Sequence, residues 1–249
     1  MCTLSFLPEK DGYVAAMNRD EQRKRAPALA PAIHRTGKLT LLYPREPSGG
    51  TWIGGNARGN LLALLNWYSM ERGKLPEKSR SRGEIIPIAL QETDAESTKR
   101  VLKQLNFAGI YPFRLFGFFP AQREIREWRW DAERLAVKFH EWGRHHWFSS
   151  SWSDERAEAE RGSACERTRR EDLADPTGWL RQLHSSHIPE PGPFSVCVHR
   201  EDAATISCTE VRCGEGELQM RHLSGNPCQA AEPPRAISIP TVADFPAIG

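Results

Sequence analysis

The pattern of apolar and polar positions predicts a β-rich protein that begins with a hairpin. Apolar runs over residues 3–7 and 12–17 flank a polar, glycine-ended segment over 9–12, which is typical of a hairpin turn. Residues 22–31 are basic and then rich in Ala and Pro, which predicts a loop. The remaining strands expected in the first third of the chain span 39–43, 49–55 and 61–67.

The rest of the chain alternates between helical and strand-like patterns. Helices are predicted over 81–91, 94–105, 153–172 and 176–185, and the third of these is so highly charged that we expect it to be mostly solvated. Strands are predicted over 110–119, 124–131, 135–142, 194–199, 205–212 and 218–223. This order predicts an α+β protein in which helix layers cover antiparallel sheets.

The C-terminal composition suggests where the domain ends. Pro and Ala become frequent from Asn226 onward, and no repeat or interdomain linker precedes that point. We therefore expect a single domain over residues 1–225 and a loosely attached tail over 226–249.

The composition is that of a globular protein. Charged residues make up 27% of the 249 residues, and no apolar run approaches the ~18–20 residues that a membrane-spanning helix requires. The first residues do not resemble a signal peptide, so the six cysteines are expected as reduced thiols in a cytoplasmic protein. A formal charge of +2 with interleaved signs gives no indication of nucleic-acid binding.

Cys2 directly follows the initiator methionine, which is generally removed when the next residue is small. Cys2 would then carry both a thiol and a free α-amine, whose ordinary pKa values of ~8.5 and ~7.7–8.0 are close enough for the amine to accept the thiol proton. One residue would thus supply nucleophile and base, as in N-terminal nucleophile catalysis. A cysteine at position 2 by itself is more often an incidental small residue.

The predicted hairpin brings other polar residues towards Cys2. Antiparallel partners sum to a nearly constant residue number, so the Asn-Arg-Asp-Glu segment over 18–21 is expected opposite the chain start. Asp20 can orient the α-amine, and Arg19 can lower the thiol pKa. Asn66, at the end of an apolar run, is a candidate donor to the oxyanion of an acyl-transfer reaction. Each residue alone suits a solvated strand end or a turn, but the combination predicts a site.

These motifs resemble those of the NRDE family, also called the transport and Golgi organisation 2 family. The matching segments are the N-terminal Met-Cys, Asn-Arg-Asp-Glu over 18–21, the Gly-Gly-Thr-Trp segment at Gly50–Gly54, Asn56–Trp67, Ser81–Pro87 and Thr205–Val211. The resemblance is sharpest over roughly residues 1–90 and continues to about residue 224.

That family is similar to cysteine-type N-terminal-nucleophile hydrolases such as penicillin V acylase and bile salt hydrolase. The resemblance implies a four-layer αββα sandwich in which Cys2 is nucleophile and base, Asp20 binds the α-amine and Asn66 contributes to the oxyanion hole. The acylases have their arginine where this chain has Met17. Adjacent strand residues point to opposite faces, so the direction of Arg19 relative to the thiol stays open.

The resemblance implies hydrolysis of a small amide, ester or thioester through an acyl-Cys2 intermediate, without a cofactor. The expected substrate-binding residues are Asn18, Trp52, Trp67 and Ser149, the last near the position of the acylases' second active-site asparagine, which is absent here. The alternative is a non-catalytic carrier of haem or of a lipid-like ligand such as an acyl-CoA. His145 or His146 could ligate haem, although neighbouring strand residues face opposite ways.

Cysteines and histidines also crowd the last quarter of the chain and invite interpretation as a zinc site. They are Cys197, His199, Cys208, Cys213, His222 and Cys228. No Cys-x-x-Cys occurs, and Cys197-Val198-His199 follows the alternation of a predicted strand. We therefore expect thiols in the core or at a sheet edge, and no metal.

Overall fold

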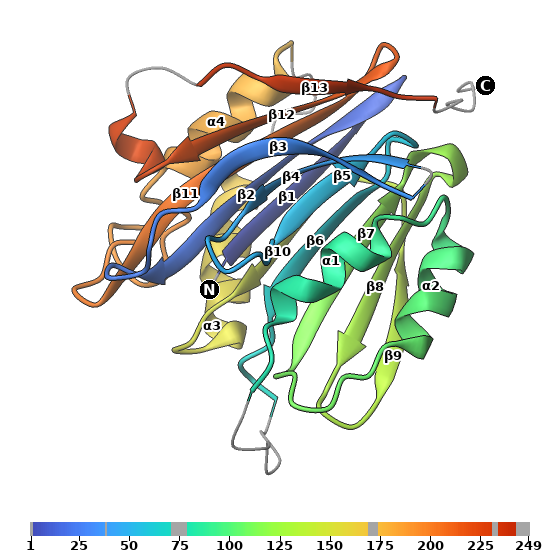
Figure 1. The fold of residues 1–249 in the computed structure, drawn as a ribbon. Coiled ribbons are helices and arrows are strands. Elements are labelled where there is room, and N and C mark those ends of the chain that lie inside the picture. The colour runs from blue at the N-terminus through green and yellow to red at the C-terminus, as the bar shows by residue number, and fades with distance from the viewer. Residues whose placement is uncertain (1, 38, 71–78, 169–173, 231–233, 243–249) are drawn as a thin grey trace.

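Two antiparallel β-sheets lie face to face at the centre of the fold (Figure 1). The structure is a computed structural model that describes residues 2–37, 39–70, 79–168, 174–230 and 234–242. The first sheet contains, in spatial order, β10 (His145–Ser149), β1 (Cys2–Glu9), β2 (Gly12–Gln22), β11 (Ala203–Gly214), β12 (Glu217–Ser224) and β13 (Ile237–Pro240). The second contains β3 (Leu29–Thr36), β4 (Leu39–Arg45), β5 (Ile53–Asn56), β6 (Leu61–Asn66), β7 (Phe113–Phe119), β8 (Glu124–Trp130) and β9 (Leu135–His140).

Helices cover the outer face of each sheet. Apolar residues of α1 (Ile85–Ala89) and α2 (Ala95–Gln104) share a core with the second sheet, and those of α3 (Asp154–Arg167) and α4 (Pro176–Ser185) share one with the first. A third core fills the space between the sheets, where the rings of Phe6 and Phe118 stack with centroids 4.5 Å apart. Within the described ranges, the remaining elements are three 3₁₀ turns: η1 (Arg82–Glu84), η2 (Pro120–Gln122) and η3 (Pro227–Gln229). The predicted αββα sandwich is confirmed.

The N-terminal hairpin has the predicted register. Glu9 pairs with Gly12 at the turn, and Cys2 pairs with Arg19 at the open end. A side chain at Gly12 would place its Cβ 1.9 Å from the carbonyl oxygen of Cys213, so glycine is required where β2 meets β11. On the other side of β1, Cys2 pairs with Ser149 of β10. Cys2 thus lies between two neighbouring strands.

Three strand predictions differ from the structure. The loop expected over 22–31 gives way to β3, an edge strand with mostly exposed side chains that tolerates Pro31. β10 was not predicted, because its pattern is short and carries two polar histidines. The strand expected over 194–199 is absent, and only an isolated bridge joins His199 to Ala204. That segment is a loop pinned by individual hydrogen bonds.

The helix over 153–172 and the C-terminal tail differ in part from their predicted form. α3 ends at Arg167, and its charged residues other than Arg161 are exposed or partly exposed, as expected. Its buried residues are Ala157, Arg161, Ala164 and Cys165, and residues 169–172 lie outside the described part. Beyond residue 225, β13 pairs with β12, and Ile239 is buried in the core between the sheets. The fold therefore continues beyond the expected domain boundary at residue 225.

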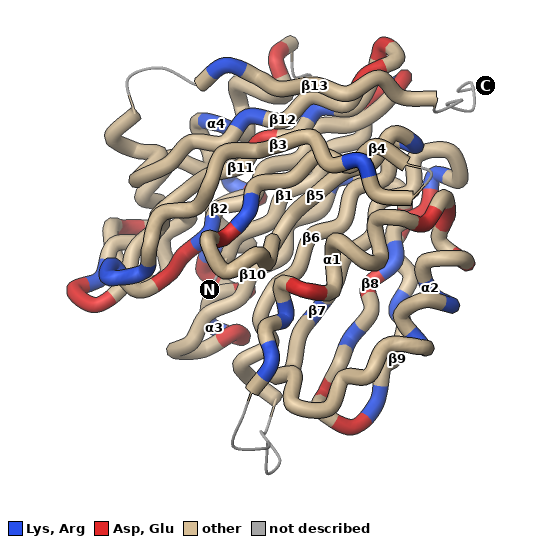
Figure 2. Tube along the Cα trace, viewed as in Figure 1, with Lys and Arg blue, Asp and Glu red and all other residues tan. Residues whose placement is uncertain are grey.

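Charged residues of both signs are interspersed along the chain in the view of Figure 2. Within the described residues, no helix is both long enough and apolar enough to cross a membrane.

Candidate active site

Cys2 opens into a cavity of about 420 Å³ at the end of the first sheet. Cys2 and Arg19 are directly opposite in the β1–β2 ladder, so their side chains project from the same face, towards the second sheet. The lining residues are Cys2, Arg19, Asp20, Glu21, Arg25, Glu46, Gly50, Thr51, Trp52, Leu64, Asn66, Ser79, Arg80, Ser81, Arg82, Gly83 and Tyr111. A cavity of this size is in the usual range for small-molecule sites.

Arg19 is held in place by acidic and aromatic neighbours. Its side chain forms an ion pair with Glu46, and its guanidinium carbon lies 4.7 Å from the centre of the Trp52 ring. A second arginine, Arg25, pairs with the same carboxylate at 2.7 Å. The Nη1 atom of Arg19 and the indole nitrogen of Trp52 are buried without a hydrogen-bond partner among the described residues. Each of these two buried donors thus lacks a protein partner within the described residues.

Asp20 lies beside Cys2 but bonds towards the helix layer. Its Oδ1 accepts a hydrogen bond from Thr205 Oγ1 at 2.6 Å, and its Oδ2 lies 3.7 Å from Nη1 of Arg161 on α3. Arg161 also donates to the Thr3 hydroxyl at 3.0 Å and to the Cys2 carbonyl at 3.4 Å. All of these groups are buried, so the Asp20 carboxylate and the Arg161 guanidinium form a buried ion pair beside the start of β1.

Burial dominates the protonation of both functional groups. Burial raises the pKa of the Cys2 thiol, and a hydrogen bond from the Asp20 backbone and the charge of Arg19 oppose this only in part. Burial also raises the pKa of the Asp20 carboxyl, against the opposing charge of Arg161 and the hydrogen bond from Thr205. A thiol in this state needs a nearby base to become a thiolate.

Two glycine-containing segments form part of the cavity wall. The backbone N–H of Thr51 donates to the carbonyl of Gly83 at 3.1 Å, and a Cβ on Gly83 would lie 2.9 Å from Cα of Gly50. Both positions therefore need glycine for the two backbones to touch. The Ser81 hydroxyl accepts from the Gly83 N–H at 3.2 Å and caps η1. Residues from both motifs, over 50–54 and 81–87, thus meet in one part of the cavity wall.

Asn66 ends β6 and reaches the same cavity. Its Nδ2 donates to the Tyr68 hydroxyl at 2.7 Å, and the backbone N–H of Tyr68 donates to Oδ2 of Asp154 at 2.8 Å. An amide nitrogen carries two hydrogens, so the bond to Tyr68 leaves a second N–H that can donate to an oxyanion.

Several residues predicted for substrate binding lie elsewhere. Asn18 points to the helix layer and donates to the carbonyls of His184 and Val196, because it alternates with Arg19 along β2. Trp67 lines a separate, smaller hollow. Ser149 does not line the cavity, but it pairs with Cys2 and its buried hydroxyl has no hydrogen-bond partner among the described residues. Of the four, Trp52 lies on the cavity wall.

The two histidines considered for haem are also outside the cavity. His146 Nδ1 lies 2.8 Å from the Ser5 hydroxyl on the helix-facing side, and burial lowers its pKa to about 4. His145 Nε2 lies 2.8 Å from the carbonyl oxygen of Glu141, and its ring stacks on Trp147. Among the described residues that line the cavity there is no histidine, so these residues do not offer haem an imidazole ligand.

Arg161 is the main site residue that the sequence reasoning missed. The high total charge of α3 predicts a solvated helix and draws attention away from the spacing of its small residues. Residues 157, 161, 164 and 165 recur at helical spacing as Ala, Arg, Ala and Cys, so the arginine shares a face with small residues in an otherwise charged helix. That spacing is the signal that could have identified a buried arginine.

The arrangement of sheets, helices and Cys2 defines a class of protein by its fold. The structure of penicillin V acylase from Agrobacterium tumefaciens is similar at a TM-score of 0.56 and 13% identity, over 96% of this chain and 86% of that one. A mutant of conjugated bile acid hydrolase from Clostridium perfringens gives a TM-score of 0.56 at 13% identity, over 96% of this chain and 92% of that one. The chain therefore has the fold of the N-terminal-nucleophile hydrolases.

Sequence comparison then assigns the family. The model of the family described as Transport and Golgi organisation 2 matches residues 1–149, more than half of the chain. The chain belongs to this family, as the Met-Cys and Asn-Arg-Asp-Glu motifs predicted. A search of curated proteins found no match.

Proposed function

We propose that the protein is an N-terminal cysteine nucleophile hydrolase that cleaves a small amide, ester or thioester through an acyl-Cys2 intermediate. The observation that carries the proposal is the convergence of the Cys2 thiol, Arg19, Asp20 and Asn66 on one cavity. No pair of these four other than Arg19 and Asp20 is adjacent in sequence. A solvated strand end or an incidental turn would not bring them together.

In the proposed mechanism, removal of Met1 exposes the α-amine of Cys2; Met1 itself lies outside the described residues. The amine takes the thiol proton, and the thiolate attacks the substrate carbonyl carbon. The tetrahedral oxyanion accepts a hydrogen bond from the Asn66 amide and from a backbone N–H. The ammonium then protonates the leaving group as the carbonyl re-forms, which gives the acyl-Cys2 thioester. Water, deprotonated by the amine, releases the acid and restores the thiol.

The supporting residues have separate tasks in this scheme. Asp20 orients the α-amine, and Arg161 keeps the Asp20 carboxylate charged within the protein interior, where burial alone favours its neutral form. Arg19 favours the thiolate over the thiol by its positive charge. Arg19 and Trp52 both line the cavity, where a polar part of the substrate can contact them.

A substrate screen tests the proposal. Wild type, Cys2→Ala and the matched control Cys165→Ala, which changes a buried thiol on α3, are incubated with chromogenic amides, esters and acyl-thioesters. We expect turnover by wild type and by the control, and a loss of at least about a thousandfold in Cys2→Ala. Equal activity of all three on every substrate would contradict the proposal and leave the alternative of a non-catalytic carrier.

We also propose a cytoplasmic location, because all six cysteines are free thiols and five of them are buried. Cell fractionation with an antibody to the protein tests this. Recovery in an oxidising compartment, with disulfides formed, would contradict it.

A further inference from the structure

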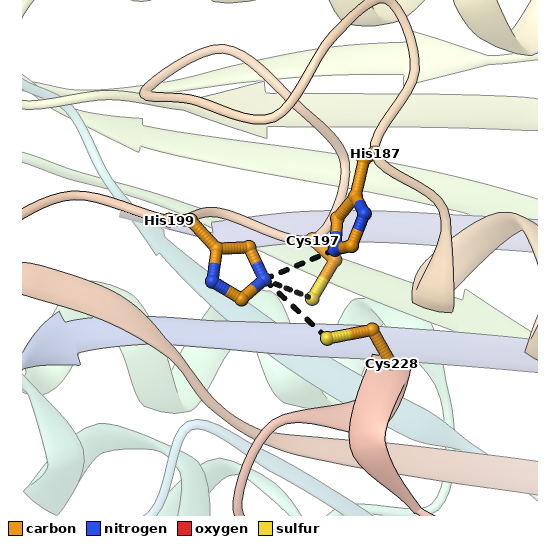
Figure 3. Close-up of side chains that lie close together, drawn as sticks. All are labelled: His187, Cys197, His199 and Cys228. Carbon is orange, nitrogen blue, oxygen red and sulfur yellow. Dashed lines mark hydrogen bonds between the residues drawn. The ribbon is translucent and has the colours of Figure 1, made fainter.

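Four metal-ligating side chains meet at a second place in the structure, separate from the cavity of Cys2. They are His187, Cys197, His199 and Cys228, and each offers one ligand atom. All four ligand atoms lie within 4.8 Å of one another. In Figure 3, the dashed lines run from one ring nitrogen of His199 to the other three residues.

The three distances from His199 match those around a tetrahedral zinc ion. His199 Nε2 lies 3.1 Å from His187 Nε2, 3.7 Å from Cys197 Sγ and 3.4 Å from Cys228 Sγ. With Zn–N bonds of about 2.05 Å and Zn–S bonds of about 2.3 Å, a regular tetrahedron separates two nitrogens by about 3.3 Å and a nitrogen from a sulfur by about 3.5 Å. Each of these three separations is within a few tenths of an ångström of these values, and the remaining pairs of ligand atoms lie within 4.8 Å.

Hydrogen bonding does not account for this arrangement. An imidazole nitrogen has either one proton or one lone pair in the ring plane, so Nε2 of His199 cannot bond well to three neighbours at once. A cation at the centre satisfies all four groups. Two thiolates and two neutral imidazoles balance the charge of a divalent ion, and this donor set in a tetrahedron selects zinc.

Hydrogen bonds between loop segments, and not a regular strand, hold these four residues together. The Cys197 N–H donates to the Ser186 carbonyl at 2.9 Å, which holds the Cys197 segment against the segment that carries His187. The Ser185 hydroxyl donates to the Pro227 carbonyl at 3.3 Å, which brings η3 and Cys228 to the end of α4. Three separate segments of the chain thus meet at one point, and the spacing of their ligands has no short motif.

We propose that His187, Cys197, His199 and Cys228 bind one structural Zn²⁺ ion. All four positions of the tetrahedron come from the protein, which is the mark of a structural rather than a catalytic site. The other grouped residues of the sequence analysis lie outside it: the Cys208, Cys213 and His222 side chains are buried within β11 and β12.

The zinc ion would brace the backbone that supports Asp20. Val198, between two of the ligands, donates its N–H to the Thr205 hydroxyl at 2.8 Å and accepts from the Thr205 N–H at 3.0 Å. The same hydroxyl donates to Asp20. Zinc binding would therefore order η3 and the loop over 186–199 and hold Thr205 in position.

Metal analysis tests this inference without any reference to hydrolysis. Protein purified under reducing conditions is assayed for zinc, and metal-stripped protein is titrated with Co²⁺, whose intense visible bands report tetrahedral thiolate ligation. Wild type and Cys165→Ala are expected to contain one zinc per chain and to show these bands. His187→Ala and Cys228→Ser change residues that are only partly buried, and circular dichroism checks that they fold.

Each ligand variant is expected to bind Zn²⁺ much more weakly than wild type. Loss of a residue that only hydrogen-bonds to a metal ligand weakens metal binding by roughly 10- to 100-fold, and loss of a ligand itself is expected to weaken it further. Reduced wild type that takes up neither Zn²⁺ nor Co²⁺ would overturn the proposal. Zinc retained equally in the folded ligand variants would overturn it as well. A Cys197–Cys228 disulfide that persists under these reducing conditions with no zinc bound is a third contrary result.

Discussion

Cys2 and Arg19 are directly opposite each other in the β1–β2 ladder, so the thiol and the guanidinium share one face of the first sheet. Asp20, the next residue, bonds instead to Thr205 and Arg161 on the helix-facing side. The Asn-Arg-Asp-Glu motif therefore lies around Cys2 on both faces of the sheet. Arg19 faces the cavity together with the thiol, and Asp20 bonds to the helix layer beside the start of β1.

Replacement of Arg19 is expected to make Cys2 less reactive. Loss of its charge in Arg19→Met raises the thiol pKa further, because Arg19 is one of the groups that oppose the effect of burial. A shift of one pKa unit would slow alkylation by iodoacetamide at neutral pH by about tenfold. Arg25→Met is the matched control, since Arg25 shares the carboxylate of Glu46 but is half exposed. Equal slowing in both variants would contradict a specific role for Arg19.

The buried pair of Asp20 and Arg161 is expected to be essential for stability. Arg161→Met leaves the Asp20 carboxylate without its cation and should reduce the free energy of unfolding by about 3–5 kcal/mol. Asp20→Asn together with Arg161→Met should recover part of this loss. Urea unfolding measures both, with Arg181→Met, which breaks the more exposed pair with Glu210, as a control that costs at most about 1 kcal/mol. Similar losses in Arg161→Met and the control would refute the buried pair.

The contact between Gly50 and Gly83 predicts that a single methyl group disturbs the cavity. In Gly83→Ala the new Cβ would lie 2.9 Å from Cα of Gly50 and 3.0 Å from the Thr51 nitrogen, and both are backbone atoms. We expect a loss of about 1–3 kcal/mol in thermal or urea unfolding. Gly143→Ala is the control, because its nearest neighbour is a His145 side-chain atom 3.9 Å away. If the two variants are equally stable, the close approach is not maintained in solution.

Glu127 gives the structure a defined acid sensitivity. Burial alone would raise the pKa of its carboxyl, but His140, Arg129 and Arg114 lower it to about 2 from the ordinary 4.5. The pKa of the folded state is the lower one, so Glu127 stabilises the fold above pH 4.5, and this contribution disappears as the pH falls towards about 2.

Substitution at this site is therefore expected to have a pH-dependent cost. Glu127→Gln should reduce the free energy of unfolding by about 2–3 kcal/mol at neutral pH and by much less near pH 2. Urea unfolding across this pH range measures the difference, with Glu133→Gln, an exposed carboxylate in the β8–β9 turn, as the control. A difference between wild type and Glu127→Gln that stays constant with pH would contradict the assignment.

The hairpin and its register could be predicted from sequence because a short turn fixes which residues are opposite. The same arithmetic placed Arg19 near Cys2. It did not reveal that Asn18 faces the helix layer, because the face that each residue occupies depends on which side of the sheet packs on the helices. β3 and β10 were missed because edge strands carry polar residues that weaken the alternating pattern.

Contacts between distant segments account for the rest of what was missed. Arg161 meets Asp20 across 141 positions of sequence, and nothing near either residue indicates the pair. The histidines and cysteines over 187–228 come together through loop hydrogen bonds that no local pattern encodes. The prediction of a regular strand over 194–199 gave no reason to expect Cys197 and His199 beside His187. In the structure this segment is a loop, and the hydrogen bond from Cys197 to Ser186 holds it next to His187.

Mass spectrometry of the intact protein after incubation with an activated acyl ester tests whether Cys2 acts as an N-terminal nucleophile. We expect a mature chain that lacks Met1 and gains one acyl group, which peptide mapping places on Cys2 and which Cys2→Ala does not acquire. A chain that retains Met1 would contradict this role of Cys2, because its nitrogen would then be an amide and not a base.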